Sequence, residues 1–141
     1  MCDVADACNG ANADDVLVVR GGGGQGEAIA RALRARRGPI TIVNGDLPCV
    51  TPVELLELTA AAPALVAAPD GTTNALALSD AREFVPLYGP GSAARYAAAI
   101  GARRLRLDGL VHDVDTWSDL ERVRDRVGPH TQRYLGALAG V

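Results

Sequence analysis

Hydrophobic positions along this chain follow two alternating patterns. Short aliphatic runs bounded by Gly, Pro or Asp are typical of buried strands. These runs occupy residues 15–20, 39–43, 64–69, 73–78, 104–108 and 111–115. Elsewhere hydrophobic residues recur every three or four positions, a spacing that predicts amphipathic helices. The helical stretches are residues 27–36, 51–61, 91–100, 116–127 and a last segment after Gly128-Pro129.

The segment that begins at Thr51 has the clearest helix start. Its side chain can accept an amide hydrogen bond, Pro52 occupies a position where no amide bond is needed, and Glu54 can return a bond to the cap. Helices that alternate with strands in this way predict an α/β fold, a mostly parallel sheet with flanking helices. A chain of 141 residues fits one domain over residues 1–141.

Composition narrows the class of protein. Hydrophobic residues make up 48% of the chain but aromatic residues only 4%, so the core must be built from Ala, Val, Leu and Ile. A net charge of -3 argues against a surface that binds nucleic acid or anionic membranes. The sequence has no secretory signal pattern, and its three cysteines form no C-x-x-C pair. We therefore expect a cytoplasmic protein without nucleic-acid or membrane partners.

A run of glycines follows the first aliphatic run. Gly21, Gly23 and Gly26 fit the pattern G-x-G-x-x-G, and Asp46 lies at the distance where a ribose-binding acid would fall. An NAD(P)-binding Rossmann protein is therefore one interpretation, because glycines let a backbone approach a pyrophosphate at the positive end of the following helix. A flexible connection without a ligand is the alternative, since a four-glycine run matches almost any glycine motif.

Three aspartates are candidates for a metal site. Asp46 follows an aliphatic run, so its carboxylate is expected at the carboxyl edge of the sheet, where open α/β folds bind ligands. Mg²⁺ favours one or two carboxylates together with substrate phosphates, so a second acid should lie at the same edge. Asp113 and Asp115 would face the same side of an extended segment. Capping of the next helix is the alternative role for Asp115.

Two further polar clusters combine flexible backbone with hydroxyl groups. Residues 70–74 and 89–92 can donate hydrogen bonds to an oxyanion, although ordinary turn and helix-capping chemistry would also explain them. His112 and His130 have no Cys or His at metal-ligand spacing, and no G-x-S-x-G motif occurs. Covalent catalysis is therefore not expected.

Five motifs, taken in order, resemble those of one enzyme family. They are GGGGQGEAIARAL, VNGDLPCVTPVELL, DGTTNALAL, LYGPGSAARYAAAIGA and HDVDTWSDL. From about residue 15 to its final helices, the chain is similar to the 2-phospho-L-lactate and phosphoenolpyruvate guanylyltransferases of coenzyme F-420 biosynthesis. The resemblance implies a GT-A-like, Rossmann-like nucleotidyltransferase fold. It also implies transfer of GMP from GTP to phosphoenolpyruvate or 2-phospho-L-lactate, with release of pyrophosphate.

The resemblance assigns roles to particular residues. Catalysis and Mg²⁺ binding would fall to Asp46 and Asp115, with Asp113 as a further metal ligand. The remaining assignments are Thr73, Asn74, Gly89 and Ser92 for the three-carbon phosphoacid, and Gly22, Gly23 and Gly24 for the nucleotide. Neither a protein nucleophile nor a general base is required, because the attacking phosphate is already largely dianionic near neutral pH.

The chain departs from the family pattern in two places. Family members begin with an additional strand, basic loop, helix and strand, so we expect an N-terminally shortened chain that lacks the segment gripping the triphosphate. Gln25-Gly26 stands where relatives usually carry Leu-Asn. A homo-oligomer or a partner would then complete the site. A downstream transferase of the F-420 pathway, which consumes the product, is a further expected partner. The alternative is a non-catalytic or vestigial phosphoacid-binding member of the family.

Overall fold

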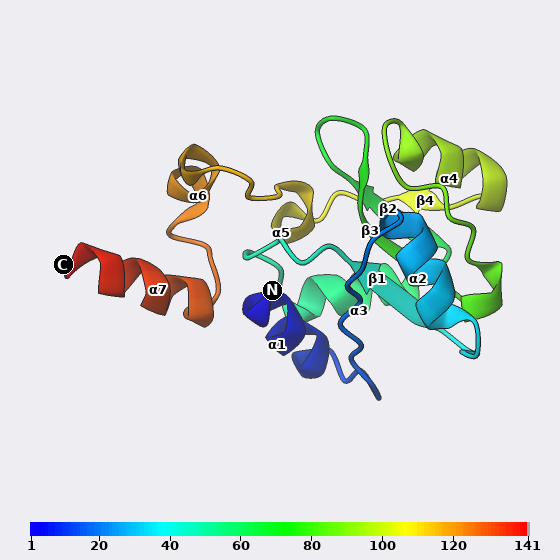
Figure 1. The fold of residues 1–141 in the computed structure, drawn as a ribbon, viewed down its shortest axis with the longest axis horizontal. Coiled ribbons are helices and arrows are strands. Elements are labelled where there is room, and N and C mark those ends of the chain that lie inside the picture. Colours follow the sequence, from blue (N-terminus) through cyan, green and yellow to red (C-terminus); the bar gives the residue numbers. More distant parts are fainter. Residues whose placement is uncertain (141) are drawn as a thin grey trace.

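The computed structural model describes residues 1–140 as seven helices, one 3-10 turn and a four-stranded sheet (Figure 1). In chain order the elements are α1 (Cys2–Gly10), α2 (Gln25–Leu33), β1 (Ile40–Val43), α3 (Pro52–Ala60), β2 (Ala64–Ala67), β3 (Thr73–Leu78), η1 (Ala81–Glu83), α4 (Ser92–Ile100), β4 (Arg103–Arg104), α5 (Asp108–Val111), α6 (Trp117–Val123) and α7 (Pro129–Ala139). The α/β class predicted from the sequence is confirmed. No helix in this part of the chain has the length and apolar character needed to cross a membrane.

The sheet is mixed, with strand order β1-β3-β2-β4. Strand β3 pairs antiparallel with both β1 and β2, and only β2 and β4 run parallel. The prediction of a mostly parallel sheet is therefore wrong. The cause is the short turn between β2 and β3, in which the Asp70 carboxylate accepts a hydrogen bond from the Thr72 amide at 2.9 Å. A connection this short reverses the chain, whereas parallel strands need a crossover of roughly a dozen residues or more.

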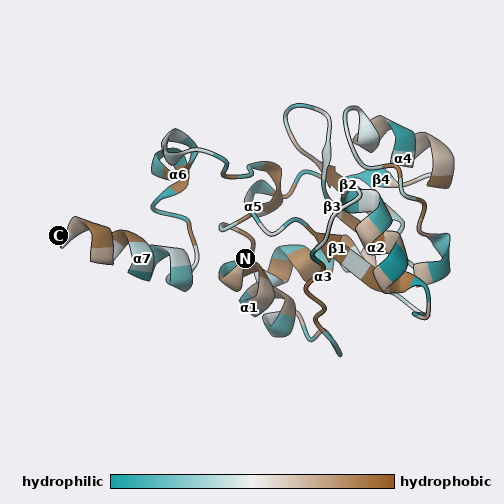
Figure 2. Cartoon of the chain, viewed as in Figure 1, coloured by the Kyte–Doolittle hydropathy of each residue, from teal (hydrophilic) through white to brown (hydrophobic). Residues whose placement is uncertain are grey.

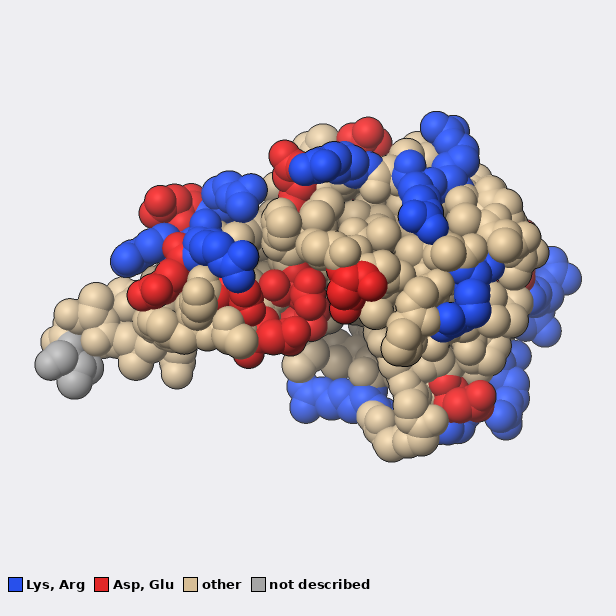
Figure 3. Space-filling model, turned by 90° about the horizontal axis from the view of Figure 1, so that it is seen from above, with Lys and Arg blue, Asp and Glu red and all other residues tan. Residues whose placement is uncertain are grey.

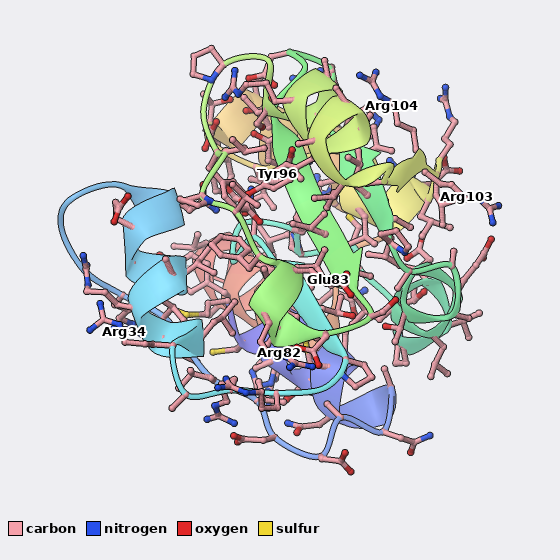
Figure 4. The ribbon with its side chains drawn as sticks, turned by 90° about the vertical axis from the view of Figure 1, so that its right-hand side faces the viewer. Arg34, Arg82, Glu83, Tyr96, Arg103 and Arg104 are labelled. Carbon is pink, nitrogen blue, oxygen red and sulfur yellow. The ribbon has the colours of Figure 1, made fainter. Side chains whose placement is uncertain are left out.

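Three of the predicted strands are missing or reduced. Residues 15–20 form a hydrophobic segment without helix or strand structure, outside the sheet (Figure 2). The exposed fractions of Leu17, Val18 and Val19 lie between 38% and 52%. A strand needs a hydrogen-bonded neighbour, and none of the four strands pairs with this run. Residues 111–115 also form no strand, since Val111 ends α5. The run over 104–108 is reduced to its first residue in the two-residue strand β4, whose arginines point outward (Figure 4).

Two hydrophobic clusters lie on opposite faces of the sheet, because successive side chains of β2 and β3 alternate between them. The larger cluster joins the sheet to α1, α3 and α5 through Val4, Ala7, Leu47, Val50, Leu55, Leu58, Val66, Ala75, Leu107 and Leu110. The smaller cluster joins the sheet to α4 through Leu65, Leu76, Leu78, Ala93, Tyr96 and Ala102. Of the aromatic residues described, only Tyr96 is fully buried, and it points from α4 into the molecule (Figure 4). The predicted aliphatic core is thus confirmed.

The start of α3 forms as predicted and also positions α5. Thr51 Oγ1 accepts a hydrogen bond from the Glu54 amide at 3.3 Å, and the Glu54 carboxylate accepts one from the Thr51 amide at 3.0 Å. The other Glu54 oxygen accepts from the Gly109 amide at 2.7 Å. A Cβ atom at Gly109 would lie 2.4 Å from the Cys49 carbonyl oxygen, so glycine is required for this close approach.

Helix α7 extends away from the sheet and is held at its first turn by α1 (Figure 1). The buried Asp3 carboxylate accepts hydrogen bonds from the His130 amide at 2.9 Å, the Thr131 amide at 3.0 Å and the Thr131 hydroxyl at 2.5 Å. Burial by itself raises the pKa of Asp3, but these hydrogen bonds outweigh it and lower the pKa below its usual value. Asp3 therefore serves as a cap for α7 from outside that helix.

We predict that Asp3→Ala lowers the free energy of unfolding at neutral pH by about 2 kcal/mol, because the start of α7 loses its charged acceptor. The lowered pKa makes this stabilisation fully present above the ordinary aspartate value of about 3.9 and lost as the pH falls below it. Urea unfolding of wild type and variant from neutral to acidic pH measures the difference. A difference that stays constant with pH would contradict the role of the Asp3 charge.

Two tyrosines of the smaller cluster provide a second test. The Tyr96 hydroxyl donates to the Val85 carbonyl at 2.7 Å and accepts from the Leu87 amide at 3.2 Å. The buried Tyr88 hydroxyl has no hydrogen-bond partner within residues 1–140. We therefore expect Tyr88→Phe to raise the free energy of unfolding by about 1 kcal/mol and Tyr96→Phe to lower it by about 2 kcal/mol. Equal losses in both variants, measured by urea unfolding, would contradict this assignment.

Candidate functional site

Three carboxylates converge where the loop after β1 meets the segment between α5 and α6. One oxygen each from Asp46, Asp113 and Asp115 lies within 4.8 Å of the others. Figure 3 shows acidic side chains gathered near the middle of this face of the molecule. The structure thus brings together the three aspartates that the sequence proposed as metal ligands.

The backbone explains why these carboxylates meet. The Val114 amide donates a hydrogen bond to the Asp46 carbonyl oxygen at 3.0 Å, which joins the two segments directly. Asp113 and Asp115 flank Val114, and the adjacent Leu47 is fully buried and anchors the loop that carries Asp46. The two segments are far apart in sequence, so the site depends on this tertiary contact.

Asp115 does not cap α6. Thr116 does so, because its side chain accepts a hydrogen bond from the Asp119 amide at 3.2 Å, and the Asp119 carboxylate returns a bond to the Thr116 amide at 2.9 Å. The capping interpretation of Asp115 is therefore wrong. Within residues 1–140, the three carboxylates of the cluster form no ion pair. His112 beside them is exposed.

The electrostatics of the cluster favour a cation. Surrounding protein atoms raise the pKa of Asp46 above its usual value, and repulsion from Asp113 and Asp115 raises it further. Carboxylate oxygens are hard ligands that Mg²⁺ and similar cations prefer, and the exposure of Asp46 and Asp115 leaves room for water or phosphate oxygens as further ligands. A divalent cation fits this donor set and would offset the repulsion.

A glycine loop is linked by a hydrogen bond to the segment that carries Asp46. Gly23 and Gly24 have φ values of 92° and 94°, which favour glycine, and the Arg31 guanidinium donates to the Gly22 carbonyl at 3.0 Å. Gly24 precedes α2 without a side-chain cap, so amides of the first turn remain available to an anion. Gln25 Nε2 donates to Asn44 Oδ1 at 2.7 Å, which links the loop to the segment that carries Asp46.

The dinucleotide-binding interpretation does not agree with the structure. Residues 15–20 form no strand, and within residues 1–140 β1 pairs only with the antiparallel β3, so residues 15–43 do not build a parallel strand–loop–helix–strand unit. Gly26 packs against another segment, because a Cβ there would lie 3.0 Å from Pro86 Cβ. The need for glycine at this position is explained by packing.

The residues expected to bind the phosphoacid lie at the start of β3 and of α4. Thr73 and Ser92 are both buried, and their hydroxyl oxygens are 2.9 Å apart and hydrogen-bonded. The Gly89 carbonyl accepts from the Ser92 amide at 3.0 Å, and Gly89 itself has φ 111°. The structure therefore brings Thr73, Gly89 and Ser92 together, but the two hydroxyls satisfy each other and are closed to solvent.

Asn74 is placed differently from its expected role. Its side-chain Nδ2 donates to the carbonyls of Leu110 and Val111, each at 3.0 Å, and its Oδ1 accepts from Asn44 Nδ2 at 3.4 Å. The amide group is thus committed to protein partners. Sequence reasoning missed Asn44, whose position two residues before Asp46 at the end of a strand was the available signal.

The chain thus has an α/β fold with an acidic cluster that could hold a cation, and a glycine loop is hydrogen-bonded to the segment that carries Asp46. No model of a known protein family matches the chain. The phosphoenolpyruvate guanylyltransferase of Thermomonospora curvata is 43% identical over 103 residues, which cover 67% of this chain and 44% of that protein. That of Streptomyces coelicolor is 37% identical over 122 residues, 80% of this chain and 57% of the other. The phosphoenolpyruvate guanylyltransferase of Geodermatophilus obscurus is 37% identical over 126 residues, which cover 84% of this chain and 58% of that protein.

The chain is therefore a relative of the phosphoenolpyruvate guanylyltransferases, and the resemblance inferred from its five motifs is confirmed. The similarity covers most of this chain. The chain itself spans about half the length of the curated relatives it matches.

We predict that Asp46→Asn abolishes stabilisation by divalent cations. Without a cation, the variant should have a Tm equal to or above that of the wild type, because one of three mutually repelling charges is gone. Millimolar Mg²⁺ or Mn²⁺ should raise the Tm of the wild type only, since a cation that binds the folded state stabilises it. Calorimetry measures both effects.

Asp108→Asn is the matched control, because Asp108 is exposed and lies outside the cluster. This control should respond to cations as the wild type does. An equal rise in Tm for Asp46→Asn would exclude Asp46 as a ligand.

Proposed function

We propose that the protein is a guanylyltransferase that transfers GMP from GTP to phosphoenolpyruvate or 2-phospho-L-lactate, releases pyrophosphate and serves coenzyme F-420 biosynthesis. The observation that carries this proposal is the cluster of Asp46, Asp113 and Asp115, with a glycine loop hydrogen-bonded to the segment that carries Asp46. The names of the relatives supply the substrate class.

The proposed reaction joins two anions. A phosphate oxygen of the three-carbon acid attacks the α-phosphorus of GTP, a P–O bond forms there, and pyrophosphate leaves with the electron pair of the broken bond. Mg²⁺, when bound, would supply positive charge that offsets the repulsion between the two phosphate groups. Asp46, Asp113 and Asp115 would hold it. No side chain has to remove a proton, because the second pKa of a phosphate monoester is about 6.

Two parts of the site would receive the two substrates. The loop of Gly22, Gly23 and Gly24 offers uncapped amides at the positive end of α2, which suits the triphosphate. Thr73 and Ser92 would donate to the phosphoacid beside Gly89 once their mutual hydrogen bond opens. The anionic ligands would therefore be held mainly by neutral donors.

The proposal includes the finer assignments that the resemblance implies. These are a single GT-A-like domain, a homo-oligomer or a downstream transferase of the pathway as partner, and a cytoplasmic location.

Pyrophosphate release tests the activity. The 141-residue chain is supplied with Mg²⁺, GTP and either phosphoacid, with and without a downstream transferase that consumes the product. We expect release that depends on one acid and falls about a hundredfold in Asp115→Asn, while Asp108→Asn retains the wild-type rate. Absence of release from folded protein would favour the non-catalytic alternative, and equal rates in both variants would remove Asp115 from the mechanism.

A further inference from the structure

Asn74 lies between the two backbone segments that carry the aspartates. It belongs to the central strand β3 and is only 2% exposed. On one side its Nδ2 holds the carbonyls of Leu110 and Val111, which end α5 shortly before Asp113. On the other side its backbone carbonyl accepts from the Asn44 amide at 3.0 Å, shortly before Asp46. One residue therefore contacts both segments.

A β-bulge determines towards which face of the sheet the Asn74 side chain points. Val66 of β2 pairs with Ala75 of β3, but the next residue, Ala67, pairs with Thr73, so Asn74 is an extra residue in β3. Regular alternation would point Asn74 to the same face as Leu76, towards α4. The bulge reverses this, so Thr73 contacts Ser92 at the start of α4 and Asn74 contacts α5.

The chemistry of the amide suits this position. Helix α5 has only four residues, so its carbonyls have no partner inside the helix. Asparagine offers two donor hydrogens and one acceptor oxygen, and Asn74 uses both functions, donating to Leu110 and Val111 and accepting from Asn44. An aspartate at this position has the same shape, but its negatively charged carboxylate would be repelled by the two carbonyl oxygens.

We infer that Asn74 is a positioning residue that fixes the separation of Asp46 from Asp113 and Asp115. Repulsion among the three carboxylates drives their segments apart. The hydrogen bonds of Asn74, together with the bond between the Val114 amide and the Asp46 carbonyl, oppose that separation. This role rests on the proposed metal site and differs from the phosphoacid binding expected for Asn74 from the family resemblance.

The test is the affinity of the full chain for Mn²⁺, measured by electron paramagnetic resonance without nucleotide. Residues that orient metal ligands typically change affinity by about 10- to 100-fold when replaced. We expect Asn74→Ala to bind Mn²⁺ at least about tenfold more weakly and Asn74→Ser, which keeps one donor, to be intermediate. Leu76→Val is the matched control, since it perturbs the buried strand without touching the amide network and should bind Mn²⁺ as the wild type does.

Circular dichroism of each variant identifies the folded samples. If Asn74→Ala does not fold, the Mn²⁺ affinity of Asn74→Ser is the test. Wild-type Mn²⁺ affinity in a folded Asn74 variant, or an equal loss in Leu76→Val, would overturn the inference. No Mn²⁺ binding by the wild type would overturn it together with the metal site. Weaker binding in the Asn74 variants without any GMP transfer by the wild type would support the inference while rejecting the proposed activity.

If the wild type does transfer GMP, excess Mg²⁺ should restore much of the rate lost in Asn74→Ser. A residue that only stabilises the fold would not respond to Mg²⁺ in this way. An Mg²⁺-independent loss of rate would therefore also count against the inference.

Discussion

The polar side chains at the buried start of β3 must find hydrogen bonds inside the protein, and much of the surrounding structure depends on this requirement. An unpaired buried polar group costs about 1–3 kcal/mol, so each must be matched by a specific partner. Thr73 finds Ser92 at the start of α4, and Asn74 finds the carbonyls that end α5. Two consecutive residues thereby attach two distant parts of the chain to opposite faces of one strand. The residues of the candidate site therefore include or adjoin both attached segments.

The carboxylate cluster places three negative charges close together. Three like charges gain nothing from proximity, and the raised pKa of Asp46 reflects the crowding of its carboxylate and the repulsion from its neighbours. The cluster persists because backbone bonds such as that from Val114 to Asp46 fix the segments regardless of the charges. A cation bound among these three carboxylates would offset their mutual repulsion.

Local chemistry was predictable from the sequence, and pairing between distant segments was not. The capping box at Thr51 depends on neighbouring residues alone, and it formed as predicted. The direction of β3 was missed because the alternation of helices and strands suggested crossovers, although no helix separates β2 from β3. The role of Asn74 was hidden for a different reason. Its amide suits a ligand or a backbone carbonyl equally well, and only the bulge decides which of them it meets.

The two halves of the candidate site differ in how ready they are for a ligand. The carboxylate half is open, since Asp46 and Asp115 are exposed, whereas the Thr73 and Ser92 hydroxyls are buried against each other. Opening the second half breaks one neutral hydrogen bond, worth about 1 kcal/mol. Hydrogen bonds to an ionised phosphate are roughly twice as strong as neutral ones, so an arriving phosphoacid would compensate for the opening. The Ala93 amide donates to the Gly71 carbonyl at 3.2 Å, which links the start of α4 to the turn between β2 and β3. Thr73 and Asn74 are consecutive in β3, so the residues proposed for the phosphoacid and the residue that contacts both aspartate segments share one strand.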